Sequence, residues 1–134
     1  MDAELRQQIR QRAQDICEYC GMPQQFDPTP FHVDHIIAVK HAGPTHKDNL
    51  ALACFACNNH KQSDISGIDP DGESDVLIRL FHPRRDDWSE HFIWNGAELV
   101  GQTPIGRVTI YVLAINAPHR VNLRQSLINE GVFP

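Results

Sequence analysis

The stretch HVDHIIAVKHAGPTHKDNLALACFACNNHK, residues 32–61, decides the fold of this 134-residue chain. It holds five of the chain's eight histidines, two of its four cysteines and three asparagines, beside one Asp-His pair. All these residue types offer metal-ligand atoms, and their density is too high for an ordinary surface loop. Some of these side chains are therefore expected to bind a structural metal, and others to take part in chemistry.

The four cysteines form two CxxC pairs, Cys17-Cys20 and Cys54-Cys57, with 33 residues between the pairs. Four thiolates are the tetrahedral ligand set of a structural Zn²⁺, and they leave no open position for a substrate. Gly21 follows the first pair and allows the tight backbone turn that such knuckles use. A redox CxxC pair is the alternative, but two pairs without a thioredoxin-like βαβ pattern disfavour it. We predict a closed zinc site that ties the N-terminal segment to the middle of the chain.

Composition limits the remaining choices. The chain has the length of one domain, and 41% hydrophobic with 22% charged residues suits a single ordinary core. No apolar run approaches the roughly 20 residues that a membrane span needs, and the N-terminus lacks the apolar core of a signal peptide. We expect a cytoplasmic protein. Its net charge of −5 argues against tight unassisted binding to long DNA, because phosphate binding normally brings a basic excess.

Local patterns predict an α+β fold in one domain, residues 1–134. The expected elements of the first half are a helix over 3–16, a strand over 31–39, a strand over 49–54 and a helix beginning just after Cys57. Those of the second half are an acidic loop over 66–75, a β-hairpin over 92–100 around Asn95-Gly96, a helix from Pro104 to about residue 115 with Thr103 as N-cap, and a helix over 118–130. We expect the second half, residues 76–134, to pack as an extension on a core over 17–66.

The zinc site would bring a second set of ligands together. If it joins the two cysteine pairs, the strands can pair as a hairpin, and Asp34-His35 comes near the helix start, where Asn58 lies. Carboxylate and amide oxygens suit Mg²⁺, so Asp34 and Asn58 are candidate ligands of one divalent cation. His35 is neutral part of the time near pH 7, as a general base must be.

These residues resemble the HNH endonucleases, whose fold is called ββα-metal. The matching pattern is C-x2-C…VDHI…DNL…C-x2-C-N-x2-K within residues 17–61. The resemblance implies an endonuclease that hydrolyses phosphodiester bonds in nucleic acid, with DNA as the expected substrate and Mg²⁺ or Mn²⁺ as the catalytic ion. It implies that His35 is the general base, that Asn49 fixes the loop orienting this base, and that Lys61 lies near phosphate.

The second half is similar to a bacterial subfamily of small HNH proteins with zinc knuckles. The similarity rests on LFHPRRDDWSEHF, residues 80–92, and GQTPIGR, residues 101–107. Two positions depart from it. The subfamily usually has Glu where Asp34 stands, and often Arg, Pro or Gly around positions 39–42, where this chain reads VKHA. Asp is the more general choice among HNH endonucleases, so the expected site is unchanged.

Several residues keep two interpretations. His32 and His60 are expected either to contact metal or phosphate or to be structural, and Arg84-Arg85 either to clamp phosphate or to form an internal salt-bridged turn with the acids that follow. His41 and His46 lie in a polar loop and are read as solvated. The function also has alternatives, namely a non-catalytic zinc-ribbon module that binds nucleic acid or protein, a nuclease subunit that needs a partner, and a homodimer.

Overall fold

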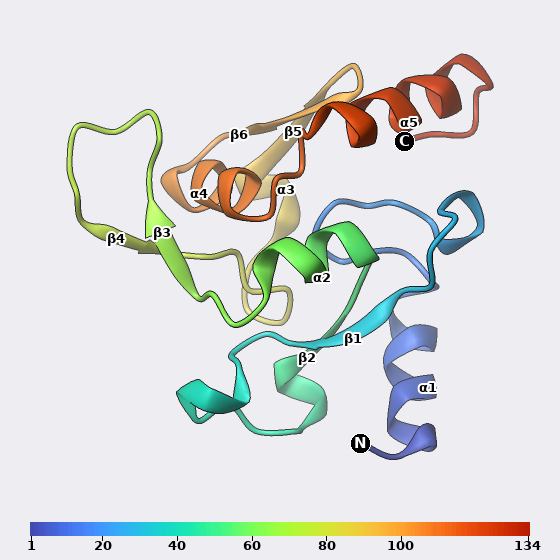
Figure 1. Ribbon diagram of the computed structural model, residues 1–134, viewed down its shortest axis with the longest axis vertical. Coiled ribbons are helices and arrows are strands. Elements are labelled where there is room, and N and C mark those ends of the chain that lie inside the picture. Colours follow the sequence, from blue (N-terminus) through green and yellow to red (C-terminus); the bar gives the residue numbers. More distant parts are fainter.

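An antiparallel hairpin covered by one helix forms the centre of the fold. The computed structural model describes residues 1–134. Strand β1 (His32–His35) pairs with β2 (Leu50–Ala53), and Asp34 lies opposite Ala51. Helix α2 (Phe55–Lys61) follows β2 and packs across β1 (Figure 1). This ββα unit, with the four cysteines clustered beside it, confirms the predicted α+β fold class.

Helix α1 (Ala3–Arg12) packs at the side of the hairpin. It ends earlier than the predicted helix over 3–16, because Gln14 and Asp15 both take a φ of 55°, which a right-handed helix cannot contain. The guanidinium of Arg12 donates to the carbonyl oxygen of Leu50 at 2.6 Å and so fixes the end of α1 to β2.

Strand β1 is also shorter than the expected strand over 31–39. Beyond His35 the backbone N–H of Ile36 still donates to the carbonyl of Asn49, but that of Ile37 donates to the Asn49 side chain. A side chain has thus replaced the partner strand, and the chain leaves the sheet. Three short 3₁₀ turns complete this half, at Gln24–Phe26, Val39–His41 and Lys47–Asn49.

The second half adds two more hairpins and three helices. Strands β3 (Ser66–Ile68) and β4 (Leu77–Arg79) pair across the acidic segment, so the prediction of an unbroken loop over 66–75 was wrong for its first three residues. The predicted hairpin around Asn95-Gly96 is confirmed as β5 (Phe92–Asn95) and β6 (Glu98–Gly101). The helices are α3 (Trp88–His91), α4 (Pro104–Val112) with Thr103 as N-cap, and α5 (Pro118–Asn129).

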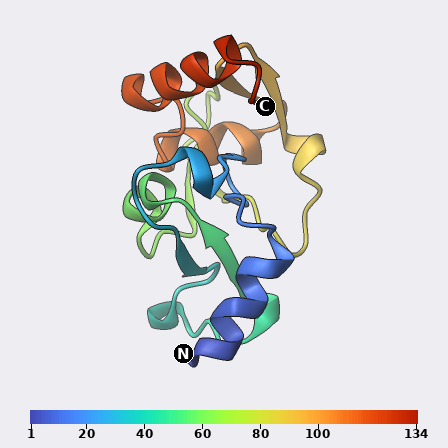
Figure 2. The same cartoon turned by 90° about the vertical axis from the view of Figure 1, so that its right-hand side faces the viewer.

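One hydrophobic core runs through both halves of the chain. It includes Tyr19 and Phe31 from the first half, and Phe81, Phe92 and Val108 from the second. Helix α2 lies between the β1–β2 hairpin and the C-terminal elements, and the two chain termini lie at opposite ends of the molecule (Figures 1 and 2). None of the helices combines the length and apolar character needed to cross a bilayer.

Candidate functional site

The four cysteines meet in the interior of the protein. Their Sγ atoms all lie within 4.8 Å of one another, and every one of the four residues is buried. The first pair comes from the loop after α1, and the second pair flanks the start of α2. The chain therefore brings together two knuckles that are far apart in the sequence.

Local hydrogen bonds shape each knuckle. The Cys17 sulfur accepts from the N–H of Cys20 at 3.5 Å, and the Cys54 sulfur accepts from the N–H of Cys57 at 3.3 Å. Gly21 takes a φ of 78°, the left-handed conformation expected for the turn after the first pair. Because Cys54 is the N-cap of α2, this helix begins before Cys57, not after it as predicted from the sequence.

The geometry and chemistry of this cluster fit Zn²⁺. Zinc–sulfur bonds of about 2.3 Å in a tetrahedron separate the sulfur atoms by about 3.8 Å. The sulfur atoms of Cys20 and Cys54 are 3.7 Å apart. Burial raises the pKa of the Cys17 thiol well above its usual value, so thiolates this close together need a cation to balance them. The four-cysteine metal site predicted from the sequence is thus present as a cluster suited to zinc.

Arg120 of α5 borders this cluster, and Arg124 lies one turn further along the same helix. Arg120 lies 3.6 Å from the Cys54 sulfur through Nη2, which also donates to Asp27 at 2.9 Å. Arg124 is fully buried, and its Nη1 is the one buried side-chain nitrogen or oxygen without a hydrogen-bond partner. A Zn²⁺ with four thiolates carries a net charge of −2, which Arg120 beside Cys54 would partly balance.

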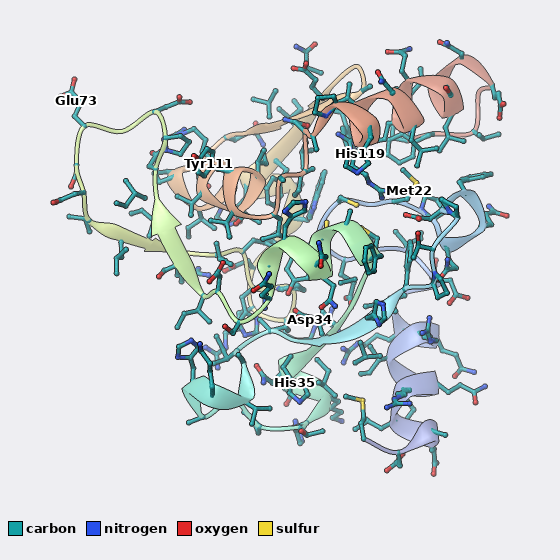
Figure 3. All side chains as sticks on the ribbon, viewed as in Figure 1. Met22, Asp34, His35, Glu73, Tyr111 and His119 are labelled. Carbon is teal, nitrogen blue, oxygen red and sulfur yellow. The ribbon has the colours of Figure 1, made fainter.

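Asp34 and His35 face opposite sides of β1, as neighbouring residues of a strand do. Figure 3 shows Asp34 beneath α2 and His35 on the other side of the strand. Their partners agree with this view. Asp34 contacts Tyr19 and Lys61, whereas His35 contacts Thr45 in the loop between the strands. The two residues therefore occupy different environments although they are adjacent.

The Asp34 carboxylate is buried in a polar network. Only 5% of the residue is exposed, and its Oδ2 accepts from the Tyr19 hydroxyl at 2.8 Å. The Lys61 ammonium lies 3.1 Å from the same oxygen and 3.4 Å from Oδ1. Burial raises the pKa of Asp34, and the nearby ammonium opposes that rise.

Lys61 differs from the expectation that it lies near phosphate. It is 1% exposed, and besides Asp34 its ammonium donates to the carbonyl oxygen of His35 at 3.1 Å. Its position on the last turn of α2, which packs on β1, directs the side chain inward. In this structure the ammonium is an internal partner of β1.

His35 is partly exposed, and its Nε2 lies 2.8 Å from the Thr45 hydroxyl. Asn49 holds the loop that carries Thr45. Its amide nitrogen donates to the carbonyls of Ile37 and Pro44, both at 2.9 Å, and its Oδ1 accepts from Ile37. This is the arrangement that the resemblance implies for Asn49, and its part in catalysis stays a prediction.

Gly43 is required where this loop passes close to β1. A Cβ at position 43 would lie 1.7 Å from the carbonyl oxygen of Ile37 and 2.9 Å from the amide nitrogen of Asn49. Any side chain would therefore push the loop away from the amide that fixes it.

The remaining residues expected in the α2 region lie near the surface. Asn58 is partly exposed and precedes Lys61 by three residues, so it lies on the same side of α2. His60 is exposed. His32 is exposed as well, and its ring lies 6.1 Å from that of Phe55 at the start of α2.

The predicted salt-bridged turn between Arg84-Arg85 and the acids that follow is not formed, and a phosphate contact of these arginines stays a prediction. Arg84 forms an ion pair with Glu18 of the first knuckle, whereas Arg85 is exposed and has no ion-pair partner. Asp86 pairs instead with Arg79, which donates to both carboxylate oxygens at 2.7 and 2.8 Å. These hydrogen bonds lower the pKa of Asp86 to about 2.

The donor atoms beside β1 suit a catalytic Mg²⁺ in kind. Asp34 offers a carboxylate on the side of β1 that faces α2, and Asn58 offers an amide oxygen from α2 itself. Of the two, Asn58 is the partly exposed one, whereas Asp34 is buried and bound by Lys61.

Sequence reasoning missed two residues of the site. Tyr19 binds Asp34, and the only signal for it was its place inside the first CxxC pair. Thr45 binds His35, and no sequence pattern distinguishes it from other polar residues of its loop. His41 and His46 are exposed, in keeping with the reading that they are solvated.

Comparison with known proteins gives one family match, to the segment that contains the four cysteines, Asp34 and His35. The family model of the HNH endonucleases matches residues 17–64, from the first knuckle to just beyond α2. No curated protein and no solved structure gives a significant match to the chain. The HNH family recognised from the sequence is thereby confirmed over this segment.

Proposed function

We propose that this chain, whose residues 17–64 form an HNH endonuclease domain, is a metal-dependent endonuclease that hydrolyses phosphodiester bonds, with DNA as its substrate. The observation that carries the proposal is the setting of His35. Its imidazole is partly exposed at the end of β1 and bonded to Thr45, in a loop fixed by Asn49. A general base needs this combination of access and fixed orientation.

The proton-transfer step follows from the two ring nitrogens of His35. When Nε2–H donates to the Thr45 hydroxyl, the neutral ring carries no proton on Nδ1. Nδ1 can then accept a proton from the attacking water, and the imidazolium keeps its hydrogen bond to Thr45. Removing the water proton as the oxygen attacks phosphorus is worth about 10²–10⁴-fold in rate for a well-placed base.

Other residues serve binding and charge balance in the proposal. A Mg²⁺ or Mn²⁺ bound by Asp34 and Asn58 would stabilise the negative charge that develops on the phosphate and the leaving oxygen. Arg85 is exposed and unpaired, so it is the stronger candidate of the two arginines for a phosphate contact. His32 and His60 are exposed near α2, and in this proposal they contact the same nucleic-acid strand as Arg85.

The zinc cluster supports the site and takes no part in the reaction. Four thiolates would fill the coordination shell, so the ion has no position for water or substrate. A reducing compartment, such as the cytoplasm, would keep these thiols free to bind metal.

The test is cleavage of plasmid and single-stranded DNA with Mg²⁺ or Mn²⁺, comparing wild type with His35→Ala. We expect cutting by wild type and a loss of at least about 100-fold in the variant. His119→Ala changes an exposed histidine on α5, away from β1, and should cut like wild type (Figure 3). Equal activity in wild type and His35→Ala would refute the role of His35.

A binding module is the second candidate, and the net charge of −5 together with the buried Asp34–Lys61 pair favours it. In that case no metal would support cleavage, and nucleic-acid or protein binding would survive Asp34→Ala and Asn58→Ala unchanged. Activity that appears only with an added partner protein would instead indicate a nuclease subunit, and activity that depends on self-association of the chain would indicate a homodimer.

A further inference from the structure

The buried ammonium of Lys61 has an unusual place in this site. It contacts both carboxylate oxygens of Asp34 and the backbone carbonyl of His35, at 3.1 to 3.4 Å. All three acceptors come from the last two residues of β1, and Lys61 and Asp34 are nearly inaccessible to solvent. A cation is therefore already seated against the carboxylate that a divalent ion would need.

Two cations on this carboxylate would repel each other strongly, because the setting is buried. Repulsion between charges grows as water is excluded, and both Lys61 and Asp34 lie where little water reaches. The Tyr19 hydroxyl would not relieve this repulsion. It donates to the same carboxylate and carries no negative charge that could balance a second cation. This repulsion disfavours binding of the ammonium and the metal ion to Asp34 at the same time.

We infer that Lys61 is a resident cation of the active site, and that a divalent ion gains Asp34 as a ligand only by displacing the Lys61 ammonium. This inference rests on the proposed function, since it concerns the ion which that function requires. The long unbranched stem of lysine lets the ammonium swing away while Lys61 stays on α2. Asn58, which is partly exposed, would then be the ligand available at all times.

The consequence for metal binding can be measured without any cleavage. Lys61→Met removes the charge and keeps a side chain of similar length. We expect Mn²⁺, followed by electron paramagnetic resonance in the absence of nucleic acid, to bind this variant roughly tenfold more tightly than wild type, because no ammonium competes. The gain should vanish in Lys61→Met/Asp34→Asn, and Lys47→Met, at an exposed lysine, should bind like wild type.

Equal Mn²⁺ affinity in wild type and Lys61→Met would overturn the inference. The variant leaves a buried carboxylate without its partner, so it could fail to fold, and a second measurement uses the unaltered protein. The chain has three lysines, of which Lys40 and Lys47 are exposed and Lys61 is buried. Each can be followed separately by acetylation and mass spectrometry.

Without metal, we expect acetylation of Lys40 and Lys47 and protection of Lys61. Saturating Mn²⁺ should make Lys61 reactive, while the two exposed lysines keep their rates and act as internal controls. If Lys61 stays protected at a Mn²⁺ concentration that saturates the site, the ammonium does not leave and the inference fails. Because neither readout depends on hydrolysis, cleavage assays and these experiments can fail independently.

Discussion

The neighbouring residues Asp34 and His35 have different proposed roles because the backbone places them in different surroundings. Asp34 and His35 alternate across β1, so one is buried with Lys61 and the other reaches the surface beside Thr45. Composition alone cannot separate them. The proposed reaction needs this split, since a base must exchange protons with solvent and a carboxylate ligand must be held still.

Thr45 is expected to position the catalytic base. Thr45→Val keeps the shape of the side chain but removes the hydroxyl that binds Nε2 of His35. We expect kcat to fall by about tenfold to a hundredfold with KM little changed, because the ring loses its orientation and preferred tautomer. Thr45→Ser should restore most of the rate. Unchanged kcat in Thr45→Val would show that this hydrogen bond does not matter for catalysis.

His82 should make stability depend on pH near neutrality. Burial lowers the pKa of His82, so below its ordinary value of about 6.5 the unfolded chain takes up a proton that the folded chain does not. The folded state is therefore favoured above that value and loses stability as pH falls toward the lowered pKa. The midpoint of thermal unfolding should drop between about pH 7.5 and pH 5.5.

A variant can assign this pH dependence. His82→Asn removes the titrating ring but keeps an acceptor for the N–H of Arg84, which His82 now binds through Nδ1 at 3.2 Å. The drop should become shallower in this variant, whereas His119→Asn, at an exposed position, should keep the wild-type slope. Parallel curves for wild type and His82→Asn would contradict the assignment.

At the scale of elements, the sequence predicted what local chemistry determines. The N-cap Thr103 and the turn at Gly96 depend on residues within four positions of one another, and both elements formed as expected. The early end of β1 depends on the side chain of Asn49, twelve residues beyond Ile37. No local pattern reveals such a contact.

The same difference between local and long-range contacts decides which parts of the candidate site could be predicted. The cysteine spacing alone predicted the cluster, because two CxxC pairs have few other uses. The burial of Lys61 could not be predicted, since it follows from how α2 packs on β1 and from the pairing of the ammonium with Asp34, 27 residues earlier in the sequence. A charged residue beside a predicted active site reads naturally as a substrate contact until its packing is known.

Helix α2 connects the two sites, so loss of zinc should abolish activity. Its N-cap is Cys54, and Asn58 directly follows Cys57. We expect Cys17→Ser/Cys57→Ser to lose the single bound zinc and to unfold α2, because structural zinc contributes on the order of 10 kcal/mol to folding. Elemental analysis, circular dichroism and the cleavage assay would check this. Stoichiometric zinc in the double variant would exclude the four-thiolate site.

At the scale of the whole molecule, the zinc cluster lies where three parts of the chain converge. The first knuckle comes from the N-terminal segment, the second from the start of α2, and Arg120 approaches from α5. With zinc bound, the cluster would carry a net charge of −2 and would attract the guanidinium of Arg120. We therefore expect the metal site to help hold the C-terminal helix, in addition to apolar packing.

Removing one of these charges should therefore loosen the metal. Arg120→Met takes a cation from beside Cys54 and leaves Asp27, which is 2% exposed, without its partner. We expect the free energy of unfolding to fall by about 3 kcal/mol, as for other broken buried pairs. Zinc transfer to a chromophoric chelator should become roughly tenfold faster, because the thiolates lose a balancing charge.

A second arginine separates the two effects of this change. Arg107→Met breaks an ion pair of Arg107 with Asp69 at 2.8 Å, on α4 and away from the thiols, so it should lower stability without speeding zinc release. Faster release in Arg120→Met alone would show that α5 balances the charge of the metal site. If both variants release zinc at the wild-type rate while Arg120→Met is less stable, Arg120 serves only Asp27, and α5 is held by packing and that ion pair without help from the metal.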